Sequence, residues 1–357
     1  MMAREDTKKK AVVDAAFGAK NRARLIEHYF QQQVGSPERL AWQHVYRLLL
    51  WIDQTTGLAH CYESDKCQPG KNWYGRSLGF HDWLSRAFDV VPHELGASLD
   101  WLFRHAADDL ATAVLKQARK LLERAEGQRK PFEGRGMPQP GEDPELVAIV
   151  RDVLGTHLKA EISTETWRVL VQRLRQYLTL ENKRKNLVGE GFEDVIASII
   201  KRAPGGSALD VRTRVPLHDL SGFNRARRGE KPNKVDLAIL RPSGGRRTLV
   251  TAKWSVRADR EKQFTQEYTD YVNAESDRRP FEYVFVTNEF DPARLMRACE
   301  ALAGNSPMFT QVVHISPDAL RATYGAAPKE ESMRKVLEYI DTERLLGVEQ
   351  WMKALVF

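Results

Sequence analysis

Two short stretches of the chain decide its fold: KVDLAIL at residues 234–240 and LVTAKWS at residues 249–255. Both are apolar runs that contain β-branched residues, which is typical of buried strands. The sequence Pro-Ser-Gly-Gly at 242–245 lies between them, and these residue types favour a turn. The pattern therefore predicts a β-hairpin whose strands are Lys234–Leu240 and Arg247–Trp254.

Helical and strand-like patterns alternate on either side of this hairpin. An amphipathic helix is predicted at Gly191–Arg202, and a polar helix at Arg257–Asn273. The other predicted elements are strands at Val211–Leu217, Tyr283–Thr287 and Gln311–Ile315 and helices at Asp291–Ala303 and Glu330–Phe357. This order predicts an α/β (α+β) fold in which helices flank a mixed β-sheet.

The first half of the chain is predicted to be mostly helical, because apolar residues recur at helical spacing within 15–29, 40–51 and 95–122. Four prolines and four glycines fall in Gly127–Pro144, which makes this segment the best linker candidate. The predicted organisation is a helical N-terminal domain at 1–126, a linker at 127–144, connecting helices at 145–185, the sheet-bearing core at 186–325 and C-terminal helices at 326–357.

Composition argues against membrane and secreted classes. No apolar run approaches the ~20 residues that a membrane-spanning helix needs. The segment Met1–Lys10 is charged and lacks the apolar stretch of a secretory signal. Three cysteines are too few for a disulfide framework. We therefore expect a cytoplasmic protein without a membrane partner.

Positive charge is concentrated in one segment. Residues 181–279 contain 21 Lys and Arg against 14 Asp and Glu, an excess of seven. The net charge of the whole chain is also +7, so the remainder is balanced. A local excess of this kind indicates an anionic partner, although a solvated charged surface has the same composition.

Two charged residues interrupt the apolar strands of the predicted hairpin. With the turn centred near Gly244, Asp236 lies opposite Ala252 and within one residue of Lys253 across the ladder. A carboxylate and an ammonium are costly to bury in apolar strands unless they pair or bind something. The pair is therefore either a structural salt bridge or part of a binding site.

Two further carboxylates lie on the neighbouring predicted helices. Glu267 follows Lys253 by 14 positions, and Glu193 lies on the helix before the strands. Carboxylates that converge on a lysine suit Mg²⁺, which takes one or two carboxylates plus waters and phosphate oxygens. The sequence thus predicts a magnesium site of Asp236 and Glu267, with Glu193 as an additional ligand and Lys253 placed to orient or deprotonate an attacking water.

These residues resemble the PD-(D/E)xK nucleases, whose core is a helix with a Glu followed by a hairpin that carries an Asp and the (D/E)xK motif. The corresponding sequences here are GEGFEDVIASII at 189–200, KVDLAIL and LVTAKWS. Thr251 stands in the acidic place of (D/E)xK. The type II restriction endonucleases that read CCGG sites carry (S/T)xK and take the second carboxylate from the next helix, a position that Glu267 matches in spacing.

The same group carries an R-x-(D/E)-R array that reads C:G pairs. Arg257, Asp259 and Arg260 stand at the corresponding offset. Arg can donate to both O6 and N7 of guanine, and Asp can accept from the cytosine amino group, although an isolated array of this kind is also a common charged helix start. The interval from Asp236 to Lys253 is shorter than in many CCGG readers, and the related CCNGG and CCWGG readers have a compact hairpin.

A basic loop is predicted between the first two strands. Its Lys and Arg residues are expected to contact DNA phosphates, and the alternative is a disordered basic loop without a ligand. These residues are Arg214, Arg225, Arg227, Arg228, Lys231 and Lys234.

The resemblance implies a prokaryotic, homodimeric, Mg²⁺-dependent type II restriction endonuclease. It would cleave double-stranded DNA at a short palindrome containing CC/GG and leave 5′-phosphate ends, with Asp236, Lys253, Glu267 and Glu193 as catalytic residues. One alternative is a repair or defence nuclease that acts on DNA structures or modified DNA without sequence specificity. Another is a catalytically inactive DNA-binding module, which Thr251 in the acidic place would suggest.

Overall fold

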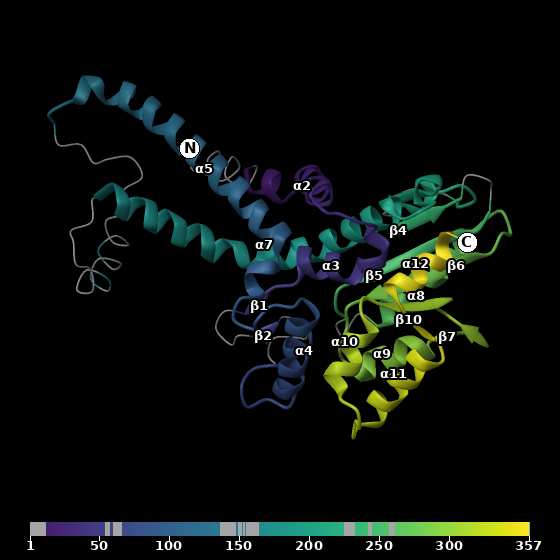
Figure 1. The fold of residues 1–357 in the computed structure, drawn as a ribbon. Helices are drawn as coiled ribbons and strands as arrows, with labels where there is room; N and C mark the ends of the chain where they lie inside the picture. The colour runs from purple at the N-terminus through teal and green to yellow at the C-terminus, as the bar shows by residue number, and fades with distance from the viewer. Residues whose placement is uncertain are drawn as a thin grey trace. The chain divides into compact units, whose positions relative to one another are not determined.

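The computed structural model describes residues 12–53, 58–59, 66–135, 148, 152, 154, 164–224, 233–241, 245–256 and 261–356 (Figure 1). The chain divides into two compact units. One consists of Met1–Arg22 and Arg104–Leu187, and the other of Ala23–Phe103 and Val188–Phe357. The sheet and the predicted site lie in the second unit. This division differs from the expected boundary at residue 126, because Ala23–Phe103 belongs to the unit that contains the sheet.

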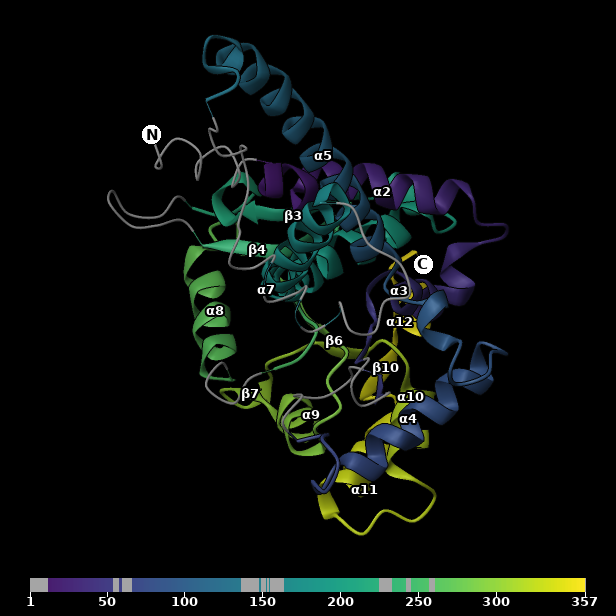
Figure 2. The same cartoon turned by 90° about the vertical axis from the view of Figure 1, so that its left-hand side faces the viewer.

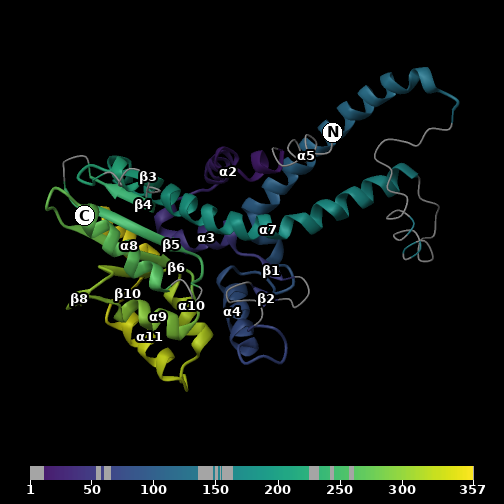
Figure 3. The ribbon, with the colours of Figure 1, turned by 180° about the vertical axis from the view of Figure 1, so that it is seen from behind.

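The second unit is built on a six-stranded mixed sheet with the strand order β10-β9-β6-β5-β4-β3. Strands β3, β4 and β5 form an antiparallel meander, whereas β5, β6, β9 and β10 run parallel. Figure 3 shows β3 to β6 side by side in this order. The predicted α/β fold with a mixed sheet is confirmed. The strands are β3 (Asp210–Pro216), β4 (Lys234–Leu240), β5 (Arg247–Lys253), β6 (Phe281–Thr287), β9 (Gln311–His314) and β10 (Leu345–Gly347).

Helices connect the strands of this sheet and flank it (Figure 2). The connections are α7 (Thr164–Arg202) before β3, α8 (Glu261–Ala274) between β5 and β6, α9 (Pro292–Glu300) after β6, α10 (Pro317–Tyr324) and α11 (Glu331–Asp341) between β9 and β10, and α12 (Val348–Val356) at the end. A small hairpin of β7 (Leu302–Ala303) and β8 (Ser306–Pro307) follows α9. The earlier elements are α2 (Ala19–Gln31), α3 (Ala41–Leu49), β1 (Ile52–Asp53), β2 (Leu58–Ala59), α4 (Tyr74–Ala87) and α5 (Trp101–Arg129).

Helix α8 covers the face of the sheet that carries the predicted site. Strand β5 is buried along its length up to Lys253, as expected for a central strand with both faces covered. Phe264 of α8 packs against Phe285 of β6, with ring centroids 5.1 Å apart. The register pairs Phe285 with Thr251, so Thr251 and α8 lie on the same side of the sheet.

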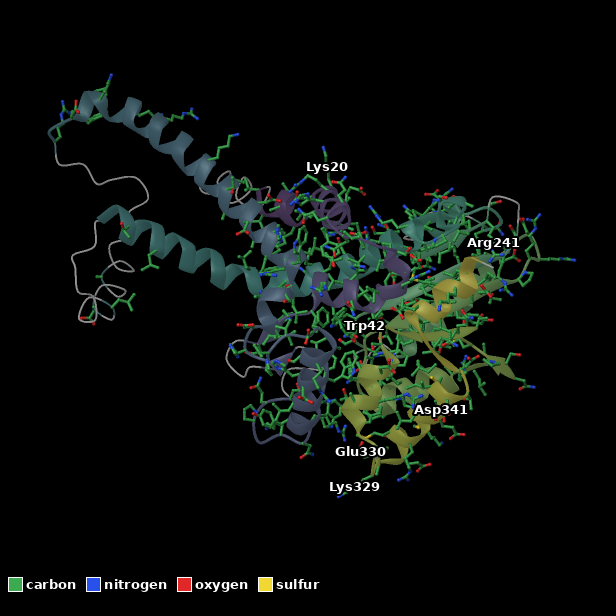
Figure 4. All side chains as sticks on the ribbon, in the orientation of Figure 1. Lys20, Trp42, Arg241, Lys329, Glu330 and Asp341 are labelled. Carbon is green, nitrogen blue, oxygen red and sulfur yellow. The ribbon has the colours of Figure 1, made fainter. Side chains whose placement is uncertain are left out.

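Helix α3 packs into the core of the same unit. Tyr46 is fully buried, and its hydroxyl donates a hydrogen bond of 2.8 Å to Oδ1 of Asn288, just beyond the end of β6. Its ring also lies against Trp254, with centroids 6.4 Å apart. Trp42, on the same helix and labelled in Figure 4, packs against Trp83 of α4, with ring centroids 5.1 Å apart. Residues of the first half of the chain therefore complete the core around the sheet.

Two local predictions differ from the structure, and the start of a third predicted element lies outside the described residues. The connecting helices at 145–185 were expected to be separate from the helix Gly191–Arg202, but α7 runs continuously from Thr164 to Arg202. Its two interior glycines cost only about 2 kcal/mol, and burial of its last turns outweighs that cost. Strand β10 interrupts the helix that was predicted at Glu330–Phe357. The sequence did not indicate this strand, because three residues are too few to show an alternating pattern. The described part of the helix after the hairpin begins at Glu261.

Gly222 lies where a side chain has no room. Its φ is +85°, and a Cβ would fall 2.4 Å from Nη1 of Arg247. That Nη1 donates to the carbonyl oxygen of Ser221, and Nη2 of the same side chain donates to that of Arg279, so the guanidinium is held in place. We expect Gly222→Ala to lower the free energy of unfolding by about 2–4 kcal/mol, from backbone strain and overpacking together. Gly70→Ala is the matched control, because Gly70 has φ +82° with no atom near the added Cβ and should lose only about 1–2 kcal/mol. Equal losses in urea unfolding would contradict the steric argument.

No helix within the described part of the chain combines the length and apolar character needed to cross a membrane.

Candidate active site

The hairpin register brings Asp236, Thr251 and Lys253 to one face of the sheet. Leu237 pairs with Val250, so Asp236 lies across from Thr251. The predicted pairing of Asp236 with Ala252 is therefore wrong by one residue. The difference matters because a shift of one residue moves a side chain to the opposite face of a sheet. In the observed register, Asp236 and Lys253 face the same side.

One carboxylate oxygen of Asp236 accepts three hydrogen bonds from β5. The Nζ atom of Lys253 donates to Oδ2 at 2.6 Å, the backbone N–H of Ala252 at 2.9 Å and the Thr251 hydroxyl at 3.3 Å. The side chains of Asp236 and Lys253 are 20% and 28% exposed, so the pair lies at the surface of the core and is open to a ligand. No described residue donates to Oδ1 of Asp236.

Helix α8 places Glu267 beside this pair. The hydroxyl of Tyr283 donates to Oε2 of Glu267 at 3.0 Å and fixes the carboxylate from the neighbouring strand β6. Burial raises the pKa of Glu267, the charge of Lys253 lowers it, and the charge of Asp236 raises it; the net direction is upward. Glu267 therefore lies within electrostatic reach of both hairpin residues.

The fourth predicted residue, Glu193, approaches from α7. Its side chain is only 10% exposed, and its Oε2 accepts a hydrogen bond of 2.7 Å from Arg214 of β3. Burial and the charge of Asp236 raise the pKa of Glu193 to about 7, against smaller opposing effects of Arg214 and Lys253. Of the four predicted catalytic residues, Asp236 and Lys253 are thus in contact, and Glu267 and Glu193 interact electrostatically with both.

Lys253 carries the positive charge at the centre of this group. Burial alone would lower its pKa, but Asp236 first, and then Glu267 and Glu193, raise it, and the net direction is upward. The ammonium group is therefore charged at neutral pH and can donate hydrogen bonds to a water molecule or a phosphate oxygen. A proton donor of this kind stabilises negative charge that develops in a reaction.

The carboxylates suit a hard divalent cation. Asp236, Glu267 and Glu193 each use one oxygen for a protein donor, and no described residue donates to the other. Within the described residues, no group of three or more His, Cys, Asp or Glu side chains is placed so that it could hold a metal ion, so Asp236, Glu267 and Glu193 do not form a protein cage for one. Mg²⁺ does not require such a cage, because it takes one or two carboxylates and completes its shell with water and phosphate oxygens.

We compared the chain with known proteins. No family model and no curated protein matches it. The chemistry of the site therefore has to be argued from its own residues. A hollow elsewhere in the second unit is lined by Lys329, Arg334 and Asp341, among others, and none of the four site residues borders it. Lys329 and Asp341 are labelled in Figure 4.

The predicted DNA-contacting residues fall into two groups. Arg214 and Lys234 are described: Lys234 is exposed at the start of β4, whereas Arg214 is bonded to Glu193 and Asp194. The others lie outside the described residues and stay predictions. These are Arg225, Arg227, Arg228, Lys231 and the recognition array Arg257, Asp259 and Arg260.

Two residues of the site were missed in the sequence. Tyr283 was assigned only to a strand, although the alternation Phe281, Tyr283, Phe285 places it on the face that α8 covers. Arg214 was instead predicted to bind phosphate. Its place in a basic segment does not indicate which acceptors its side chain reaches.

The raised pKa of Glu193 predicts a pH-dependent stability. In the folded protein it is about 7, above the ordinary value of 4.5, so folding favours the protonated form. This contribution is fully present below pH 4.5 and is lost as the pH rises to about 7, and it amounts to about 3 kcal/mol. We expect the unfolding free energy of wild type minus that of Glu193→Gln to fall by this amount between pH 4.5 and 7.5. Urea unfolding in EDTA measures it, and a pH-independent difference would contradict the prediction.

Proposed function

We propose that this chain is a Mg²⁺-dependent endonuclease that hydrolyses double-stranded DNA, specifically a type II restriction endonuclease. The observation that carries the proposal is the contact of Lys253 with Asp236 at the ends of two neighbouring strands, with Glu267 and Glu193 on the adjoining helices. Grouping a lysine with three carboxylates in a largely buried position costs desolvation free energy that a purely structural ion pair would not justify. Such groups are concentrated at functional sites, and this combination suits phosphodiester hydrolysis.

In this proposal Asp236 and Glu267 hold the cation, with Glu193 as an additional ligand. Bound Mg²⁺ supplies Lewis-acid stabilisation of the scissile phosphate. Lys253 donates a hydrogen bond that orients the attacking water, and its charge stabilises the negative charge that develops on the phosphate oxygens. Attack in line with the leaving 3′ oxygen would leave a 5′-phosphate end.

The order of elements supports the same proposal. Helix α7 with Glu193 precedes the β3-β4-β5 meander with Asp236 and Lys253, and α8 with Glu267 follows it. This is the helix-then-hairpin order of the PD-(D/E)xK nucleases, and Glu267 provides the carboxylate that Thr251 lacks. The restriction-endonuclease-like core is part of the proposal.

The target and the assembly are also proposed. The positive excess at 181–279 surrounds the site in sequence and favours a polyanion such as DNA. Specificity for a short palindrome containing CC/GG rests on Arg257, Asp259 and Arg260 by resemblance. A palindrome has two-fold symmetry, so we propose that a homodimer binds it.

Digestion of an unmethylated plasmid with Mg²⁺, and with EDTA as the control, tests this function. Discrete fragments whose sequenced ends share a CC/GG palindrome and carry 5′-phosphates are the expected result. A Mg²⁺-dependent smear would instead support the nuclease without sequence specificity. DNA binding without any cleavage would support the inactive DNA-binding module and overturn the proposed activity.

A further inference from the structure

Arg214 occupies an unusual backbone position next to the site. It lies on β3 between the paired positions Thr213–Leu237 and Val215–Val235, so it stands across from Asp236. Its φ is +49°, in the left-handed region that non-glycine residues seldom adopt. Strained backbone of this kind persists where surrounding interactions hold it, and it is concentrated at functional sites.

The side chain of Arg214 is occupied by protein acceptors. Its Nη1 donates to Oε2 of Glu193 at 2.7 Å and to the carbonyl of Glu190 at 3.3 Å. Its Nη2 donates to Oδ1 of Asp194 and to the Thr213 hydroxyl. Four acceptors thus match the four terminal N–H groups, and only the Nε–H has no acceptor among the described residues.

This arrangement fixes the direction of Glu193. A planar guanidinium that binds two neighbouring carboxylates holds both more rigidly than a single ammonium can. The side chains of Glu193 and Asp194 are only 10% and 13% exposed, so neither moves freely into solvent. Glu193 is consequently held where it interacts with Asp236 and Lys253.

We propose that Arg214 is a positioning residue of the site: it fixes the Glu193 carboxylate beside the Asp236–Lys253 pair so that a divalent cation binds, and it does not contact DNA phosphates. The proposal rests on the function proposed above. It replaces the prediction that Arg214 belongs to the phosphate-binding set.

Two variants of the full chain test the proposal. Arg214→Gly removes the guanidinium and suits the left-handed backbone, so the strand is retained. Arg214→Lys keeps the charge but cannot bind both carboxylates with a planar fork. Arg212→Ala is the matched control, because Arg212 lies on the same strand and is bonded to Asp210 instead of the site.

Calorimetric titration with Mn²⁺ alone is the first measurement. Both Arg214 variants are expected to bind Mn²⁺ about 10–100-fold more weakly than wild type, with Arg212→Ala unchanged. In cleavage assays with Mg²⁺ the loss is expected in kcat, with KM for DNA unchanged. Affinity for duplex DNA in EDTA, and its dependence on salt, should equal those of wild type.

Each outcome bears on the proposal. Wild-type Mn²⁺ affinity in Arg214→Gly, or full recovery by Arg214→Lys, overturns it. A decrease of about 1 in the slope of log K against log salt identifies a phosphate contact and also overturns it. If wild type cleaves no DNA and the Arg214 variants still bind Mn²⁺ more weakly than wild type, the inference about Arg214 stands and the proposed function is wrong. Absence of Mn²⁺ binding by wild type removes the inference whatever the DNA result.

Discussion

Lys253→Ala is expected to lower Mg²⁺-dependent DNA cleavage by about 10³-fold. Among the described residues, Lys253 is the one cation that contacts Asp236, and it interacts with Glu267 and Glu193 as well. Its loss removes the donor proposed to orient the attacking water and leaves three carboxylates without the positive charge that interacts with them. Single-turnover cleavage of plasmid DNA at saturating Mg²⁺ measures the effect on the chemical step.

Controls separate this effect from a loss of folding or of DNA binding. Lys335→Ala removes an exposed lysine of α11 that pairs with Glu300 and should cleave like wild type. Thermal unfolding followed by circular dichroism establishes that Lys253→Ala is folded. The affinity for DNA in EDTA should change much less than the rate. If Lys253→Ala cleaves within threefold of wild type, Lys253 has no role in the reaction.

Glu267→Gln is expected to lower cleavage by about 10²–10³-fold. The substitution keeps the size of the side chain and an oxygen that can accept from Tyr283, but it removes the negative charge proposed to hold the cation. Because the charge is lost and the packing is kept, stability should change little while higher Mg²⁺ concentrations are needed. Cleavage rates measured across a Mg²⁺ titration give both quantities.

Gln266→Ala is the matched control for this change. Gln266 precedes Glu267 on α8, is exposed and donates a hydrogen bond to Asp270, so its loss should leave cleavage unchanged.

A second variant tests whether Glu267 supplies the carboxylate that is missing at Thr251. Thr251→Asp in the Glu267→Gln chain places an acid beside Asp236 and should restore part of the activity. Full activity of Glu267→Gln alone would show that α8 contributes no ligand.

The sequence was sufficient to predict the hairpin and the charged residues that it carries. Strand β4 was predicted with its observed bounds, because apolar runs on both sides of a Pro-Gly-rich turn are a strong local signal. That Asp236 and Lys253 lie close together along the hairpin followed from the same signal, although their shared face did not, and Glu267 was expected near them from the helix that packs over the sheet. These are local or nearly local relationships.

Register could not be predicted from the same signals. The connection between β4 and β5 spans residues 241–246, and a loop of this length permits neighbouring registers of similar energy. Placing Asp236 opposite Ala252 instead of Thr251 is an error of one residue. It would still have put Asp236 on the wrong face of the sheet relative to Lys253.

The partners of Arg214 were beyond local reasoning as well. A sequence reports that a residue is basic, but not whether its neighbours in space are phosphates or carboxylates. The contact with Glu193 joins positions 21 residues apart on a helix and a strand, and it depends on a left-handed backbone at a residue other than glycine. Such strain has no compositional signature.

The bond from Tyr46 to Asn288 joins positions 242 residues apart in the chain, and it bears on how this protein can be divided. A fragment starting near residue 186 would retain every strand of the main sheet, yet it would uncover Trp254 directly after Lys253 and leave the Asn288 side chain without this donor. The half of the chain that carries the sheet is therefore not a portable module. Fusion partners or domain exchanges would have to join the chain ahead of Ala23 and carry helices α3 and α4 along with the strands.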